Sequence, residues 1–222
     1  DLTANSAAKN TITGLSAVDL TKPDGTKLTG GLTFAVVDNT GAQLGGAISN
    51  GTWVSAANSD NAYIKLTAAN STGAVASWDV VVKVTPVGGT AQNYTVSVPD
   101  NGSATIRSMF PMDKSYTVEV VSATAVEPLT IENQTWNNDT GILTLTFNKD
   151  VRTGFGKNNV VCTPNTVSAQ AVQVNGKTLT IEFAMGTTAT GNITVNLTNV
   201  TDDSESASAT FAWTAPAAPA PI

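Results

Sequence analysis

The residues that could do chemistry in this chain are mainly carboxylates, because the sequence contains no histidine. Histidine is the commonest general base and the commonest metal ligand near neutral pH. Asp202, Asp203 and Glu205 form a small acidic cluster, and Ca²⁺ takes carboxylate and carbonyl oxygens from loops of this kind. The spacing does not match an EF-hand loop. We therefore interpret the cluster as a solvated acidic loop, with a Ca²⁺ site as the alternative.

Asp139 and Asp150 are the other carboxylates that invite a catalytic interpretation. Two carboxylates on either side of a glycosidic bond are the machinery of most glycoside hydrolases. No pattern in the sequence brings these two side chains to face each other, and a hairpin turn accounts for Asp139 without any chemistry. We expect no glycosidase site here.

Cys162 is the single cysteine, so it cannot form an internal disulfide. It follows Val160 and Val161, and we expect it to be a small hydrophobic residue in a strand, with a reactive thiol as the alternative. One cysteine neither requires nor excludes an extracellular setting. Overall we assign no catalytic, cofactor-binding or metal-binding residue, no cofactor, and no enzymatic activity.

The four tryptophans could form a platform for a sugar, but we expect them to pack in cores or at a domain interface. The best candidate for an exposed aromatic is Trp136, because its neighbours Thr135 and Asn137 are polar. The tryptophans are Trp53, Trp78, Trp136 and Trp213.

Asn-x-Ser/Thr triplets are about twice as frequent as the composition would give by chance. Glycosylation of a surface protein is one explanation. The other, which we favour, is that Thr-rich strands meeting Asn-rich turns generate the triplets. They begin at Asn50, Asn70, Asn93, Asn101, Asn133, Asn138, Asn192, Asn196 and Asn199.

Charge and hydropathy exclude two classes of function. Charged residues make up 13% of the 222 residues, about half the usual share, and such a polar, weakly charged surface suits a protein that packs against copies of itself. The net charge of −6, with scattered Lys and Arg, argues against nucleic-acid binding. No apolar run approaches 18 residues, so we expect no membrane insertion.

The elements that must position these residues are β-strands. In Leu143-Thr-Leu-Thr-Phe147 large apolar residues alternate with threonines, which is the pattern of a half-buried strand. Asn175-Gly176 lies between two such runs, and we expect both residues to adopt positive φ in a hairpin turn. Residues 78–84 have little polar face, which predicts a central strand. No segment has helical periodicity, so the sequence predicts an all-β protein.

The strands divide into two groups, each long enough for one sandwich. We expect β-sandwiches over residues 12–123 and 129–213, with about seven strands in the second and a linker over 124–128. Residues 1–11 and 214–222 are expected to be extended arms that contact other chains, because an extended terminus can add to an exposed sheet edge. The Asp1 start predicts either a cleaved N-terminal piece or an initiator Met left out of the sequence.

Residues 78–123 resemble the C-terminal part of a fibronectin type III domain. Met109-Phe110-Pro111 followed by Tyr116-Thr-Val118-Glu-Val120 carries the likeness, with a Pro-to-Tyr spacing one residue longer than usual. In that family the tyrosine hydroxyl bonds back to the chain in a tyrosine corner. The resemblance implies an Ig-like sandwich in which Tyr116 plays this part.

Residues 129–213 resemble the bacterial Ig-like domains of S-layer and phage structural proteins. The matching features are Leu143–Val151, the hairpin around Asn175-Gly176, and Asn196–Asp202, after which this chain lacks the family's usual Gly-Asn. Such modules occur in surface layers, adhesins, filaments and tailed-phage virions. The resemblance implies a fold more than a function.

These features together predict two tandem Ig-like, fibronectin III-like sandwiches in a non-enzymatic structural protein on the exterior of a repeating assembly. Our first expectation is a tailed-phage virion component, such as a capsid decoration, tail or fibre protein, on the virion exterior. The alternative is a secreted bacterial or archaeal surface protein, such as an S-layer, filament or adhesin subunit. A third hypothesis, a carbohydrate-binding module, depends only on the tryptophans. The expected partners are copies of itself or other subunits, and possible partners include a host surface glycan.

Overall fold

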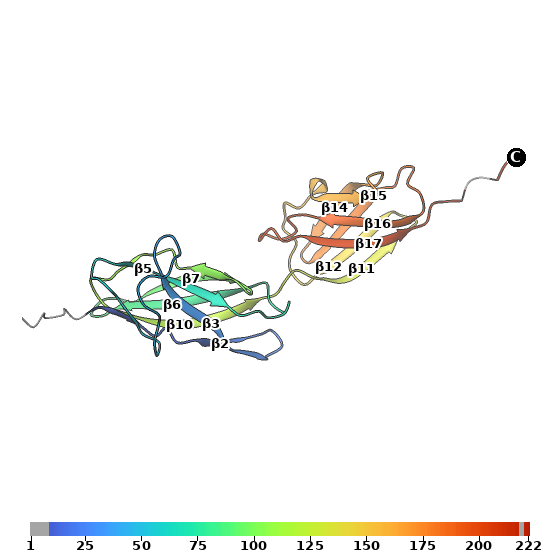
Figure 1. The fold of residues 1–222 in the computed structure, drawn as a ribbon. Helices are drawn as coiled ribbons and strands as arrows, with labels where there is room; N and C mark the ends of the chain where they lie inside the picture. Colours follow the sequence, from blue (N-terminus) through green and yellow to red (C-terminus); the bar gives the residue numbers. More distant parts are fainter. Residues whose placement is uncertain (1–8, 218–219) are drawn as a thin grey trace, which may run out of the picture. The chain divides into compact units, whose positions relative to one another are not determined.

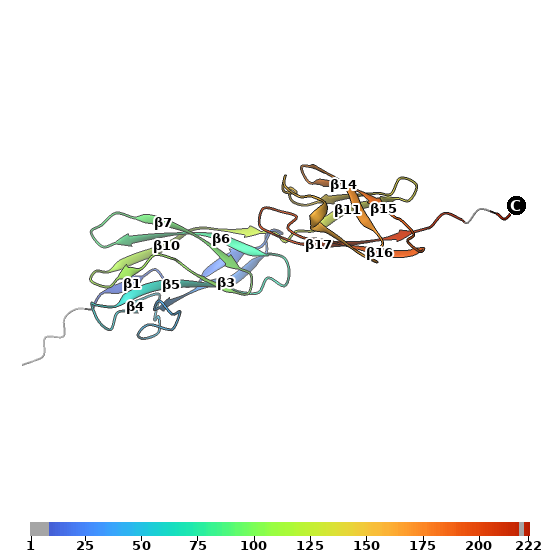
Figure 2. The same cartoon turned by 90° about the horizontal axis from the view of Figure 1, so that it is seen from above.

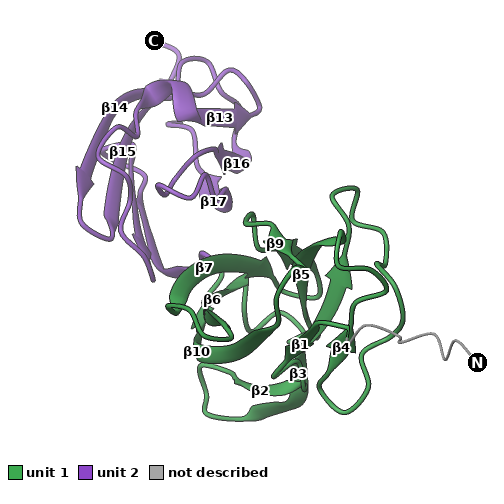
Figure 3. Ribbon diagram, turned by 90° about the vertical axis from the view of Figure 1, so that its left-hand side faces the viewer, with its two compact units in different colours: residues 1–128 green, residues 129–222 purple. Residues whose placement is uncertain are grey.

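The computed structural model describes residues 9–217 and 220–222. The chain divides into two compact units, Asp1–Pro128 and Leu129–Ile222 (Figure 3). Within the described residues the only helical element is a single 3₁₀ turn, η1 (Lys157–Asn159), and every other regular element is a β-strand. The all-β prediction is therefore confirmed. No helix in the described part of the chain is long and apolar enough to cross a membrane.

Unit 1 is a sandwich of two sheets (Figures 1 and 2). One sheet has the order β4-β1-β10-β6-β7, and the other has the order β2-β3-β5-β8 with β9 paired to β5. The strands are β1 (Thr11–Thr13), β2 (Val18–Thr21), β3 (Lys27–Val37), β4 (Trp53–Val54), β5 (Asn61–Ala68), β6 (Ser77–Pro86), β7 (Gln92–Pro99), β8 (Ser103–Thr105), β9 (Phe110–Pro111) and β10 (Tyr116–Val126).

The core of unit 1 forms because apolar residues alternate along the strands. On β6, Trp78, Val80, Val82 and Val84 all point inward and are buried. β6 lies between β10 and β7, as expected for a strand with so little polar face.

The tyrosine corner of unit 1 is present. The ring of Tyr116 is buried and its hydroxyl donates a 2.8 Å hydrogen bond to the Pro111 carbonyl. The connectivity, however, differs from the immunoglobulin order, in which the corresponding strand lies between strands C and G. Here β10 is the last strand of the unit and lies between β6 and β1, with β1 parallel to it.

Unit 2 has the strand order of an immunoglobulin constant domain. Its sheets are β11-β12-β15-β14 and β13-β16-β17, which is ABED packed on CFG when the seven strands are lettered along the chain. The expected number of seven strands is confirmed. They are β11 (Ile131–Asn137), β12 (Ile142–Phe147), β13 (Val160–Thr163), β14 (Ser168–Asn175), β15 (Thr178–Ala184), β16 (Gly191–Leu197) and β17 (Ala207–Trp213).

The hairpin between β14 and β15 is confirmed, but its turn is shifted by one residue. Asn175 still pairs with Thr178, so the loop consists of Gly176 and Lys177. Gly176 has φ of 60°, whereas Asn175 is not among the residues with positive φ. A glycine at the first loop position is the pattern of a type II′ turn. The expectation of positive φ at both Asn175 and Gly176 is wrong, because this turn type needs only one such residue.

The expected linker over residues 124–128 begins too early, because β10 continues to Val126. A β-bulge between Val120 and Ser122 shifts the alternation along β10 and leaves Val121 52% exposed. The bulge explains why the sequence pattern loses its alternation before the strand ends.

In both expected arms, the residues next to the sandwich are part of the folded unit. Thr11 is the first residue of β1, and the Asn10 side chain donates to the Met112 carbonyl at 2.9 Å. At the other end, the Thr214 backbone N–H donates to Asn138 Oδ1 at 3.0 Å. These residues are therefore not free arms. Residues 1–8 and 218–219, also part of the expected arms, lie outside the described residues.

Candidate functional site

Glu205 braces the start of unit 2. Its carboxylate accepts hydrogen bonds from the Leu129 backbone N–H at 2.9 Å and from Lys149 Nζ at 2.8 Å, and a third from the Thr201 hydroxyl at 3.1 Å. Burial raises the pKa of Glu205, but these hydrogen bonds and the Lys149 charge outweigh it, so the pKa is lowered. Glu205 is thus a structural residue, a role that the sequence did not indicate because Leu129 and Lys149 are distant along the chain.

The other two members of the acidic cluster, Asp202 and Asp203, are exposed. Across the described residues, no group of three or more His, Cys, Asp or Glu side chains is arranged to hold a metal ion. The loop that carries the cluster therefore gives no geometric support to a Ca²⁺ site.

Asp139 and Asp150 lie beyond opposite ends of β12, which has six residues. A strand of that length spans about 20 Å at its usual rise, whereas the two carboxylates of a glycosidase lie about 5–9.5 Å apart. Asp139 belongs to the β11–β12 turn, where its backbone N–H donates to Asn137 Oδ1 at 3.0 Å. The hairpin explanation of Asp139 is confirmed, and the structure does not bring the two carboxylates together.

Cys162 is a buried residue of β13 with a free thiol, so its expected role as a small hydrophobic residue is confirmed. Burial also raises the pKa of its thiol, which keeps it in the less reactive protonated form.

The tryptophans pack inside the two units. Trp53 and Trp78 are 1% and 0% exposed, and the indole N–H of Trp213 donates to the Thr188 carbonyl at 3.2 Å. Trp136, the best candidate for an exposed aromatic, is half-buried and stacks on Phe211 with ring centroids 3.9 Å apart. The side chains of Thr135 and Asn137 lie on the exposed face of β11. The Trp136 side chain lies on the other face, where it packs against the core of unit 2. A tryptophan platform for sugars is not formed.

Most Asn-x-Ser/Thr triplets have local structural explanations. Asn50, Asn101 and Asn199 adopt positive φ in turns, a conformation that asparagine tolerates. Asn70 Oδ1 accepts the Thr72 backbone N–H at 2.8 Å, and Asn138 binds Thr214. These positions favour the turn-composition explanation over selection for glycosylation.

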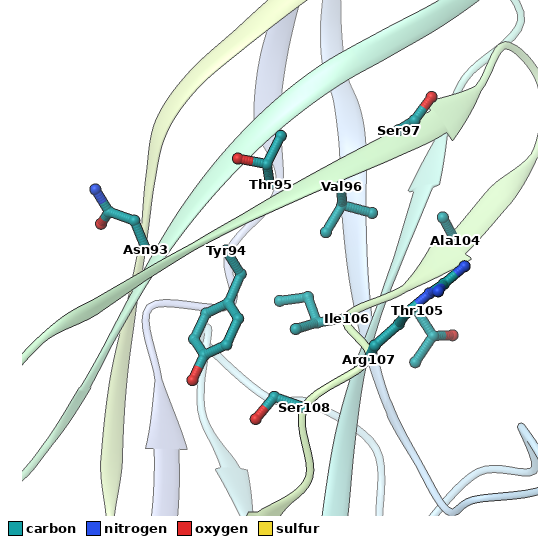
Figure 4. A pocket seen from close by; sticks show the side chains of 10 residues that line it. All are labelled: Asn93, Tyr94, Thr95, Val96, Ser97, Ala104, Thr105, Ile106, Arg107 and Ser108. Atoms are coloured by element: carbon teal, nitrogen blue, oxygen red, sulfur yellow. The ribbon is translucent and has the colours of Figure 1, made fainter.

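A hollow in unit 1 lies between β7 and the segment that begins with β8 (Figure 4). It has a volume of about 870 Å³. Tyr94, Val96 and Ile106 form its apolar floor, and Arg107 is the only charged residue that lines it. Because β7 joins one sheet and β8 the other, the two strands diverge after their short turn. The groove is therefore bordered by one edge strand from each sheet.

The β7 side of this groove presents unpaired backbone groups. The Asp100 N–H donates to the Ala76 carbonyl at 3.0 Å, and the β6–β7 register has no shift. Since bonded pairs alternate in an antiparallel ladder, Tyr94 and Val96 bond to β6, and the backbone groups of Asn93, Thr95 and Ser97 point away from it. The sequence predicted β7 as a strand, but its residue pattern did not indicate whether the strand lies at the edge or in the centre of a sheet.

Comparison with known protein families gives one match. A family model described as a CopC domain matches residues 130–215, which lie in unit 2. No curated protein and no solved structure matches the chain. The CopC match agrees with the Ig-like sandwich of unit 2, and it points to a different family from the S-layer and phage domains that the sequence resembles.

Proposed function

We propose that this chain is a non-enzymatic structural protein of an extracellular assembly, and that it acts by association through its sheet edges. The observation that carries this proposal is the edge of β7, an uncharged strand of eight residues whose segment from Asn93 to Ser97 borders a groove. An open edge with these properties is a template for pairing with another chain. The chemistry-bearing side chains, in contrast, take structural roles: Glu205 is a brace, Asp139 belongs to a turn and Cys162 is part of a core.

The CopC match favours one of the two settings expected from the sequence. CopC proteins are periplasmic or extracellular, which agrees with an exported surface protein. No comparison supports a virion protein. We therefore place the cell surface ahead of the virion exterior, and keep the virion as the alternative that the experiment must test.

A second candidate function, copper binding, comes from the same match, because a CopC domain suggests a copper-binding or copper-resistance protein. Cu(II) favours imidazole and Cu(I) favours thiolate and thioether ligands. The chain has no histidine, and the sulfur atoms of unit 2 belong only to buried Cys162 and to Met185. The residues present do not fit a copper site, so we propose that unit 2 uses the CopC-type fold without copper.

Localisation and copper binding can be tested separately. In the source cells, a tagged chain should be accessible to an impermeant amine reagent from outside and should form multimers when cross-linked. Recovery of the chain in the cytoplasm would refute the proposal, and recovery in purified phage particles would favour the virion alternative. Competition with a Cu(I) chelator, and calorimetry with Cu(II), should detect no binding to the purified chain. Stoichiometric binding at low micromolar concentration would favour the second candidate.

A further inference from the structure

We infer that β7 of one copy pairs antiparallel with β7 of a second copy, around a two-fold axis that passes between the two copies of Thr95. This inference depends on the proposed function, because it names the partner of the edge on which that function relies. A two-fold interface uses the same surface on both copies. The surface must therefore be complementary to itself, and the register of β7 satisfies this condition.

The backbone groups needed for this pairing point outward at alternate residues. Asn93, Thr95 and Ser97 direct their N–H and C=O groups away from β6, and their side chains are exposed on the outer face of the sheet (Figure 4). When Thr95 faces Thr95 of the second copy, Asn93 faces Ser97 of that copy. All three outward-facing residues then meet outward-facing partners. Pro99 lacks an N–H and limits the ladder to these pairs.

The side chains also match in this register. On the outer face two threonines lie opposite each other, and on the inner face Tyr94 lies opposite Val96 of the second copy. Threonine pairs and aromatic pairs with β-branched residues are favourable across antiparallel strands. Tyr94 is half-exposed, so the second copy would cover apolar surface that water now contacts. The neighbouring groove, of about 870 Å³, leaves room for the incoming strand.

The other edges of unit 1 are less suitable for pairing. β2, β4 and β8 have four, two and three residues, and short strands are a usual protection of sheet edges. β7 has eight residues. It carries no lysine, no other charge and no bulge, so neither charge repulsion nor distortion blocks a second copy.

Long strands also lie at edges of unit 2, but those edges are modified. β14 has a register shift between Ala169 and Ala171, and bulges of this kind make an edge harder to extend. On β17 the Thr210 carbonyl accepts a 2.7 Å hydrogen bond from the Gln134 side chain. β11, another long edge strand, has a register shift between Ile131 and Asn133, and β13 has only four residues. Among the described edges, β7 is therefore the one that best fits a second copy.

The register can be tested with single cysteines in a Cys162→Ala background, which removes the only native thiol. Residues of a bonded antiparallel pair have Cα atoms about 5.5 Å apart, within the range of a disulfide. Under mild oxidation Thr95→Cys should therefore form a linked dimer. Asn93→Cys and Ser97→Cys should each stay mostly unlinked alone and should form a mixed dimer together. Linkage of all three to the same extent, or of none, would overturn the register.

Sedimentation equilibrium gives an independent measurement without cysteines. One strand per copy is a small interface, so we expect a weak dimer with a dissociation constant on the order of 10–1,000 μM. Thr95→Lys places like charges opposite each other and should weaken dimerisation at least tenfold. The matched control is Thr117→Lys, since Thr117 is exposed on the same face of the sheet but on the interior strand β10; it should leave the constant unchanged.

The outcomes separate this inference from the proposed function. A chain that remains monomeric throughout this range, or equal effects of Thr95→Lys and Thr117→Lys, would overturn the β7 pairing. If the chain associates but is insensitive to Thr95→Lys, the pairing is wrong while association as the mode of action stands. Thermal unfolding of each variant verifies that unit 1 remains folded.

Discussion

The hydroxyl of Tyr116 provides a sharp test of how unit 1 is held together. Tyr116→Phe removes the 2.8 Å hydrogen bond to the Pro111 carbonyl but keeps the ring, which packs edge-on against Phe110 with centroids 5.5 Å apart. An unsatisfied buried carbonyl would cost up to about 3 kcal/mol. Pro111 is only half-buried, so water can replace the lost donor. We therefore expect a loss of about 1 kcal/mol, equivalent to about 4 °C in the melting temperature of unit 1.

The assay must resolve the two units, because a chain of two units need not unfold in one step. Hydrogen exchange with mass spectrometry does so: peptides of β6 and β10 should lose protection, while unit 2 peptides serve as an internal reference. The matched control is Tyr94→Phe, which removes an exposed hydroxyl bonded only to Gln92 and should cost well under 1 kcal/mol. Equal effects of the two substitutions would refute the tyrosine-corner argument.

The same hydroxyl gives unit 1 a dependence on alkaline pH. Burial raises the pKa of Tyr116, and the charge of Asp113 adds to this effect. The folded state therefore binds the tyrosine proton more tightly than the unfolded state. The resulting stabilisation is fully present below a pH of about 10 and is lost as the pH rises further. Tyr116→Phe should remove this part of the alkaline decline, which exchange measurements on unit 1 at pH 9 and pH 11 can check.

Three further outcomes follow from the packing of single residues. Gly14→Ala places a Cβ 1.9 Å from the Val118 carbonyl oxygen and should cost more than about 3 kcal/mol, whereas Gly25→Ala, with a similar positive φ but open space, should cost only about 1 kcal/mol in urea unfolding. Glu205→Gln should destabilise unit 2 by about 1–2 kcal/mol at neutral pH; since the pKa of Glu205 is lowered on folding, this difference should fade as the pH falls below about 4.5. Cys162 should react with iodoacetamide at least 100-fold more slowly in the native chain than in urea, and equal rates would show that β13 opens readily.

The sequence was a good guide to strands because their side chains alternate between two environments. The run from Leu143 to Phe147 became β12, with its three large apolar residues fully buried. Period-two alternation reports directly which face of a strand is buried. It also located the core of unit 1 around Trp78, and the sandwich class followed from the number and spacing of such runs.

The features that the sequence did not reveal depend on contacts between distant residues. The bulge near Val121 shifts the alternation in β10, so a regular pattern could not mark the end of the strand. Trp136 has polar neighbours along the chain, yet Phe211 covers it from another sheet. Glu205 finds Leu129 and Lys149 only after folding. Each of these features depends on strand order, and strand order cannot be read from side-chain periodicity.

Strand order also decides which strands leave an edge open for pairing with another chain. β6 and β7 have similar alternation, and both bury valines against the same core. β6 pairs on both sides with β10 and β7, whereas β7 pairs only with β6. Strands with similar sequences therefore differ in role: β6 is an interior strand of the sheet, whereas β7 is an edge strand that could pair with another chain. β7 carries no lysine, and its one proline, Pro99, is its last residue. Asn93, Thr95 and Ser97, whose backbone groups face outward, are exposed positions where an edge under selection against pairing would carry lysine or proline. A strand that is long, uncharged and regular at an edge is costly to keep in a protein that must stay monomeric, and its presence here is the physical reason to look for function at the edge and not in a pocket.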